Sequence, residues 1–228
     1  MSKYRYEFRV MVEEDREDVA QLVAQCFAGK ETITKYLGES VEECYANYAK
    51  PVALSAVPNL SFVCIDHFAK NEIIACILCK NVEVEDMQSI EPLNAKEAFD
   101  RLNNDFKRRF LALHKNDNVK DHLSNECICL KDKYGSRGIA TNLIRLSLIN
   151  AKHLGYQFAL MMPTVHEMVH TVKEKLNARK LFGVHYADIE YNGISYFKTI
   201  TDPKSYDAYE ITLADFDTDC HRVKLSFD

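Results

Sequence analysis

The sequence lacks any long apolar run and any excess of positive charge, and these absences narrow the class of protein. No hydrophobic run reaches the ~18 residues of a membrane-spanning helix, and the opening MSKYRYEFRV alternates where a signal peptide needs an apolar block. Lys and Arg number 29 against 34 Asp and Glu, which gives a net charge of -5. We therefore expect a cytoplasmic protein that binds neither nucleic acid nor a membrane.

Repeats, low-complexity tracts and linkers are also missing, so we expect residues 1–228 to form one domain. Its eight cysteines are expected to be reduced core residues, because nothing else indicates an oxidising compartment. Cys76 and Cys79 form a C-x-x-C within a strand-like run and should point to opposite faces. Cys127 and Cys129 should share one face of a strand as two buried thiols.

Apolar periodicity predicts a mixed α/β chain, because segments that alternate like strands are interleaved with segments of helical spacing. Predicted strands cover residues 6–12, 61–68, 71–84, 122–131 and 156–162, and predicted helices cover 13–30, 39–49, 93–113, 139–155 and 165–180. The second and third strands should form a hairpin, and Asn192-Gly193 marks another. Loop residues are expected around Pro51 and Pro58. The last strand-like segments, 208–216 and 221–227, receive no place in the predicted sheet.

The turn KYGSRGIA, residues 133–140, lies between a predicted strand and a predicted helix. Such a turn presents free backbone N–H groups, and the helix dipole adds partial positive charge. Gly138 lets a ligand approach the backbone and Arg137 supplies a cation, so a phosphate or pyrophosphate is the natural ligand. An ordinary strand-to-helix turn is the alternative. Neither G-x-x-x-x-G-K-[ST] nor G-x-G-x-x-G fits, which disfavours the common nucleotide-binding folds.

GSRGIA resembles the Q/R-x-x-G-x-G/A signature of the GNAT superfamily of acetyl-CoA-dependent N-acetyltransferases. Gly138 and Ala140 are in register and Tyr134 occupies the usual aromatic position, whereas Gly135 replaces the usual Gln or Arg. The element order over residues 5–200 also fits the family. The resemblance implies an α/β GNAT fold, with a mixed central sheet of splayed central strands flanked by helices.

The same resemblance implies how acetyl-CoA would bind. Backbone amides of the turn would hold the CoA pyrophosphate; the residues concerned are Gly135, Ser136, Arg137, Gly138, Ile139 and Ala140. The pantetheine arm would bond to the backbone of the central strand, at Ile128, Cys129 and Leu130. Thr164 would lie near that arm.

Within the superfamily, CFAGKETITKYLG and the long helical segment 93–113 are similar to the arylalkylamine or dopamine N-acetyltransferase type. That type has Glu-Pro-Leu where this chain has Glu31-Thr32-Ile33, and its glutamate acts as general base through water. The resemblance implies direct acetyl transfer to a primary amine, a small arylalkylamine-like amine or a polyamine. A solvated loop carboxylate is the alternative for Glu31, and the family's tyrosine acid has no match.

Two other functions stay open. Gly135 and the missing tyrosine would also suit a GNAT-like domain that binds acyl-CoA without turnover. Residues 166–170, HEMVH, match the H-E-x-x-H of zinc metallohydrolases, with Glu190 as a possible third ligand. A capping box from Thr164 to Glu167 would instead occupy that glutamate, and Glu190 lies in a strand-like run, so the zinc site is disfavoured.

Overall fold

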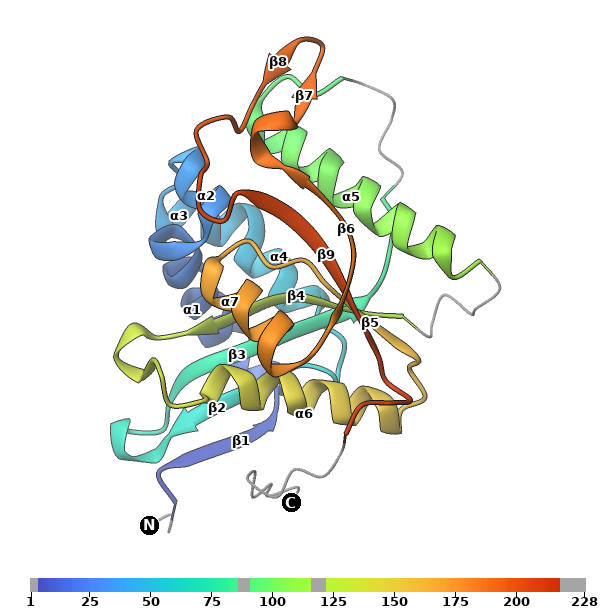
Figure 1. Cartoon of the computed structure of the whole chain (residues 1–228). Helices are drawn as coiled ribbons and strands as arrows, with labels where there is room; N and C mark the ends of the chain where they lie inside the picture. Colours follow the sequence, from blue (N-terminus) through green and yellow to red (C-terminus); the bar gives the residue numbers. More distant parts are fainter. Residues whose placement is uncertain (1–3, 86–90, 116–121, 218–228) are drawn as a thin grey trace.

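The computed structural model describes residues 4–85, 91–115 and 122–217. Its centre is a seven-stranded sheet in the order β1-β2-β3-β4-β5-β9-β6, accompanied by a two-stranded β7-β8 hairpin (Figure 1). The β4–β5 pair is parallel and the other pairs of the sheet are antiparallel. The strands are β1 Tyr6–Val10, β2 Phe62–Asp66, β3 Glu72–Asn81, β4 His122–Leu130, β5 Phe158–Met161, β6 Arg179–His185, β7 Glu190–Tyr191, β8 Ile194–Ser195 and β9 Ser205–Thr212.

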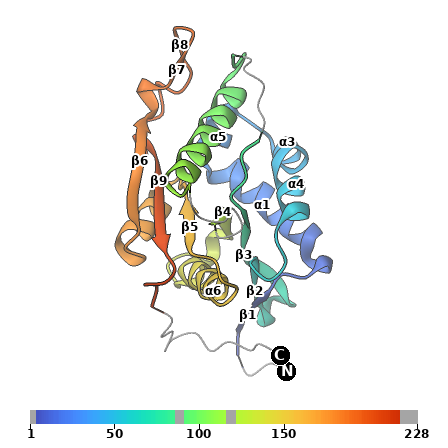
Figure 2. The same ribbon diagram turned by 90° about the vertical axis from the view of Figure 1, so that its right-hand side faces the viewer.

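Helices cover both faces of this sheet. They are α1 Arg16–Lys30, α2 Thr32–Leu37, α3 Val41–Cys44, α4 Lys50–Ser55, α5 Ala95–Leu113, α6 Ile139–His153 and α7 His166–His170. One π-helical turn, Tyr45–Ala49, joins α3 to α4, and another, Thr171–Lys175, extends α7. Figure 2 shows α1 and α4 on one side of the sheet and α6 on the other. The predicted GNAT layout, with a mixed sheet flanked by helices, is confirmed.

Alternating strand residues divide the core into layers. In β5, Ala159 and Met161 pack in the cluster that contains α6, whereas Leu160 packs in the cluster that contains α5. Cys79 lies in the α6 cluster and Cys76 in the α1 cluster, as the strand period predicted. Both faces of the central strands are therefore buried, which explains their nearly continuous apolar sequence.

Several predicted elements are confirmed. The hairpin β2–β3, the helix α5 and the hairpin at Asn192-Gly193 form where the sequence pattern placed them. Asn192 and Gly193 both have positive φ, 50° and 77°, as the tight turn between β7 and β8 requires.

Two predictions are wrong, and a third segment is a predicted strand whose place in the sheet the sequence did not give. The loop expected around Pro51 is part of α4, a helix that directly follows the π-helical turn Tyr45–Ala49 and has proline as its second residue. The helix expected over 165–180 ends early, because residues from Arg179 onward pair with β9 as β6. The strand around residue 208 is β9, which lies between β5 and β6. Residues 221–227, the last strand-like segment, lie outside the described residues.

Across the described ranges, no helix combines the length and apolarity that crossing a bilayer requires. The cytoplasmic location and the single domain over 1–228 stay predictions.

We expect Leu143→Ala, on α6, to lower the free energy of unfolding by about 2–5 kcal/mol, because Leu143 is fully buried and alanine would leave a cavity. Leu154→Ala, at the end of the same helix where the side chain is exposed, should cost less than about 1 kcal/mol. Urea denaturation followed by circular dichroism measures both. Equal losses would contradict the packing described for α6.

Candidate functional site

The two central strands separate part of the way along their length. Pairing between β4 and β5 runs from His122 opposite Phe158 to Asn125 opposite Met161. Strand β5 ends there, while β4 continues to Leu130 with β3 as its partner. One edge of β4 beyond Asn125 is therefore without a strand partner.

A cleft of about 1140 Å³ opens at this separation. Its walls are the end of α1, the unpaired part of β4, the turn before α6, and the segment from β5 to α7. The cleft brings together nearly all the residues that the sequence singled out: Glu31, Ile128, Cys129, Leu130, Gly135, Ser136, Gly138, Ile139, Ala140 and Thr164. These residues come from four separate parts of the chain.

The backbone of β4 faces this cleft at alternate residues. The Lys131 N–H donates to the Ile74 carbonyl of β3 at 3.0 Å. Because peptide groups alternate in direction along a strand, Ile128 and Leu130 turn their polar groups toward the cleft, and Cys129 turns its own toward β3. Two peptide units can thus bind an extended polar ligand.

The turn before α6 has the backbone shape of an anion-binding concavity. Ser136 and Gly138 both adopt left-handed conformations, with φ of 61° and 76°. Gly138 is the N-cap residue and makes no side-chain cap, so the first-turn N–H groups of α6 are not covered by a capping side chain. Residues 135–136 and 138–141 line the cleft, so this end of α6 offers backbone donors to a negatively charged ligand.

The Arg137 side chain points away from the cleft. Its guanidinium donates to the Tyr6 hydroxyl and, at 3.3 Å, to the Lys133 carbonyl on the reverse side of the turn. Any contribution of Arg137 to a ligand in the cleft is therefore confined to its backbone N–H.

Glu31 is the N-cap of α2, a helix that the sequence analysis missed. Its Oε1 accepts from the Ile33 N–H at 3.0 Å, and its Oε2 accepts from the Thr34 N–H and hydroxyl at 2.6 and 2.7 Å. The residue is only 8% exposed, so the alternative of a solvated loop carboxylate is wrong. Oε1 keeps room for another donor, and Glu31 lines the cleft.

Glu126 is a second cleft carboxylate, and the sequence analysis did not select it. Lys107 donates to its Oε1 at 3.0 Å and Ser124 donates to the same oxygen at 2.6 Å. Its position in β4 was a usable signal, because a charged residue stands inside a central strand, directly before the apolar run of residues 127–130.

Cys26 brings a thiol from α1 to the cleft wall. Its Sγ lies 3.7 Å from the Leu130 carbonyl oxygen, which can accept the thiol proton. A hydrogen bond with the Cys129 thiol lowers the pKa of Cys26, and Lys30 adds to this effect against the opposing effect of burial. Burial instead raises the pKa of Cys44 to about 11 and of Cys64 to about 12. Cys26 is therefore set apart from these two buried thiols.

The HEMVH segment forms α7 at the rim of the cleft. Its N-cap is Val165 without a side-chain hydrogen bond, so the predicted capping box of Thr164 and Glu167 is wrong. His166 Nδ1 lies 3.3 Å from Asp202 Oδ1. Within the described ranges, no three His, Cys, Asp or Glu side chains are grouped as metal ligands, so these residues offer no set for zinc.

The chain was compared with protein families, with curated proteins and with solved structures. No protein-family model matches the sequence, and no curated protein matches it.

Solved structures do match. A protein designated arylalkylamine N-acetyltransferase 7 from the mosquito Aedes aegypti has a TM-score of 0.70 at 15% identity, over 91% of this chain and 87% of that one. The C-terminal condensation domain of Ebony, in complex with beta-alanyl-dopamine, gives 0.67 at 12% identity, over 91% and 98%. Arylalkylamine N-acetyltransferase 2 from Aedes aegypti gives 0.65 at 16% identity, over 92% and 100%. The chain has the fold of the GNAT N-acetyltransferases.

Proposed function

We propose that the chain is an acetyl-CoA-dependent N-acetyltransferase that acetylates a primary amine by direct attack on the thioester. The observation that carries this proposal is the cleft itself, in which the free edge of β4 meets the amide-lined turn before α6. The likeness to acetyltransferase structures supports the same function.

The pyrophosphate and the pantetheine arm of acetyl-CoA would each lie against a different part of the cleft wall. Backbone N–H groups of residues 135–140 would hold the pyrophosphate, where the dipole of α6 favours negative charge. The peptide units of Ile128 and Leu130 would pair with the amides of the pantetheine arm, with Thr164 on the facing wall. The arm would thereby replace the strand that β4 lacks.

The acceptor must attack as a neutral amine, so its ammonium form first has to lose one proton. Glu31, directly or through one water at Oε1, would take that proton. The amine nitrogen then forms a bond to the thioester carbonyl carbon, and a β4 N–H stabilises the oxyanion. Collapse of this intermediate breaks the carbon–sulfur bond and releases CoA thiolate, and the surplus proton on the amine nitrogen passes to that thiolate or to water, which leaves the neutral acetylated amine. A thiolate is a good leaving group, so no acid is assigned.

A small amine is the acceptor we propose, either arylalkylamine-like or a polyamine. The arylalkylamine alternative gains support from the similar mosquito structures.

Gly138→Asp should abolish micromolar acetyl-CoA binding measured by isothermal titration calorimetry. The new carboxylate would repel the pyrophosphate from the start of α6, and aspartate is strained at a φ of 76°. Gly155→Asp is the matched control, because Gly155 follows the same helix, also has positive φ and open space at Cβ, and does not line the cleft. Equal acetyl-CoA binding by both variants would contradict a pyrophosphate site at the turn before α6. An absence of acetyl-CoA binding by the wild-type protein would refute the proposed function.

Glu31→Gln should lower kcat about 100-fold or more in a steady-state assay with tryptamine and spermidine, because glutamine cannot accept the amine proton. Glutamine keeps one acceptor oxygen for the cap of α2 but sets its amide NH2 against the other backbone N–H donor, so the free energy of unfolding should fall by about 1 kcal/mol while the chain stays folded at the assay temperature. Glu126→Gln, at a second carboxylate that lines the cleft, should change kcat much less. The reverse order would assign the base to Glu126, and acetyl-CoA binding without measurable turnover of any amine would indicate the binding-only alternative.

Acetyl-CoA should protect Cys26 from alkylation by iodoacetamide at pH 7.5, since the thiol lines the wall where the pantetheine arm would lie. Peptide mass spectrometry with and without acetyl-CoA measures the modified fraction at each cysteine. We expect Cys26 to react faster than Cys44 and Cys64, whose pKa values are raised. Unchanged alkylation of Cys26 at saturating acetyl-CoA would place the arm elsewhere.

A further inference from the structure

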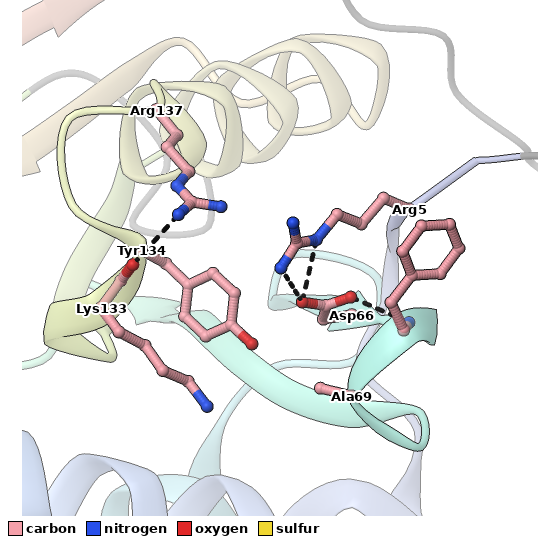
Figure 3. Close-up of a pocket in the computed structure, with 7 residues that line it drawn as sticks. Arg5, Asp66, Ala69, Lys133, Tyr134 and Arg137 are labelled. Atoms are coloured by element: carbon pink, nitrogen blue, oxygen red, sulfur yellow. Dashed lines mark hydrogen bonds and ion pairs between the residues drawn. The ribbon is translucent and has the colours of Figure 1, made fainter.

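A second pocket, of about 340 Å³, lies behind the turn that borders the cleft. Lys133, Tyr134 and Arg137 line this rear pocket, whereas the cleft takes Gly135, Ser136 and Gly138 from the same turn. The remaining lining residues come from just before β1, from the end of β2 and from the turn that follows β2: Arg5, Asp66, Phe68 and Ala69 (Figure 3). One short segment therefore serves as the wall between two pockets.

The floor of the rear pocket is a fixed ion pair. Asp66 is fully buried and accepts from Arg5 Nε at 3.2 Å and Nη2 at 3.0 Å, and from the Phe68 N–H at 2.9 Å. Burial raises the pKa of the Asp66 carboxyl, but hydrogen bonds from Arg5 and Tyr134 outweigh it and hold the pKa below its usual value. Asp66 thus stays charged and neutralises Arg5.

Positive charge remains uncompensated around this floor. Glu72 faces two ammonium groups, those of Lys131 and, at 3.5 Å, Lys133. The Arg137 guanidinium donates to two neutral oxygens, the Tyr6 hydroxyl and the Lys133 carbonyl. Two carboxylates, Asp66 and Glu72, therefore face four cations in a chain whose net charge is -5. The cations are Arg5, Lys131, Lys133 and Arg137. An anion would gain from Lys133 and Arg137 together.

The mouth of the rear pocket also carries an exposed aromatic ring. Phe68 is 73% exposed, and the Arg5 guanidinium lies 6.0 Å from its ring centroid. On the opposite wall, the Tyr134 ring lies between Lys133 and Arg137, 5.1 and 5.4 Å from their charged groups. A planar group on a ligand could lie against Phe68 while its anionic group meets these cations.

We propose that the rear pocket binds a small organic phosphate, with the phosphate held by Lys133 and Arg137 and a planar ring resting on Phe68. A volume of about 340 Å³ accommodates a ligand of one ring and one phosphate. This site is separate from the acetyl-CoA cleft and does not depend on the proposed acetyl transfer.

The test is a titration of the ¹⁵N-labelled full chain with phenyl phosphate and with inorganic phosphate, at constant ionic strength, followed by ¹H–¹⁵N correlation spectra. We expect saturable shifts at the amides of Phe68 and Ala69, which line the rear pocket and not the cleft. Phenyl phosphate should bind more tightly than inorganic phosphate. No shift at these amides, or shifts confined to the cleft amides of Ala140 and Thr164, would overturn the proposal.

Variants separate the two parts of the site. Lys133→Gln and Arg137→Gln should each weaken both probes about tenfold, as loss of a charged hydrogen-bond donor predicts. Phe68→Ala should weaken phenyl phosphate alone. Lys198→Gln removes one positive charge from an exposed residue outside the pocket and should leave both affinities within about twofold of wild type. If Lys198→Gln weakened the binding of both probes as much as the pocket variants do, the net charge of the protein would explain the effect, and the proposed site would be refuted.

Discussion

The early end of pairing between β4 and β5 is the constraint on which the rest of this structure depends. Peptide groups need partners, and a strand that loses its neighbour in the middle of a sheet would normally be costly. Here the sheet stays continuous because β4 pairs with β3 along its length and β5 pairs with β9 from Phe158 to Met161. The separation therefore leaves donors and acceptors inside a cleft without breaking the sheet.

What surrounds these open peptide groups determines the chemistry that the cleft can support. The turn before α6 adds backbone donors suited to an anion, and Glu31 and Glu126 add carboxylates that can accept protons. Each glutamate is held in place, Glu31 by the first amides of α2 and Glu126 by Lys107 and Ser124. Positioned groups of this kind lose less freedom when a ligand binds than flexible surface side chains do.

The turn before α6 contributes residues to two pockets. Left-handed residues at positions 136 and 138 turn the amides toward the cleft, while the side chains of Lys133, Tyr134 and Arg137 project to the reverse side. The buried Asp66 receives hydrogen bonds from Arg5 and Tyr134 there, so the first strands of the sheet support the turn from behind.

The sequence by itself determined most of the local elements and the glycine-bearing turn before α6, since periodicity, Asn192-Gly193 and the glycines around Arg137 act over a few residues. The GNAT resemblance added the order of the elements. Only the tertiary structure decided that β9 inserts beside β5, that Glu31 caps a helix at the cleft wall, and that Arg137 turns away toward Tyr6. Glu126 and Asp66 likewise gained their roles from partners far along the chain. Such contacts join residues that no local pattern links, and so a single sequence does not reveal them.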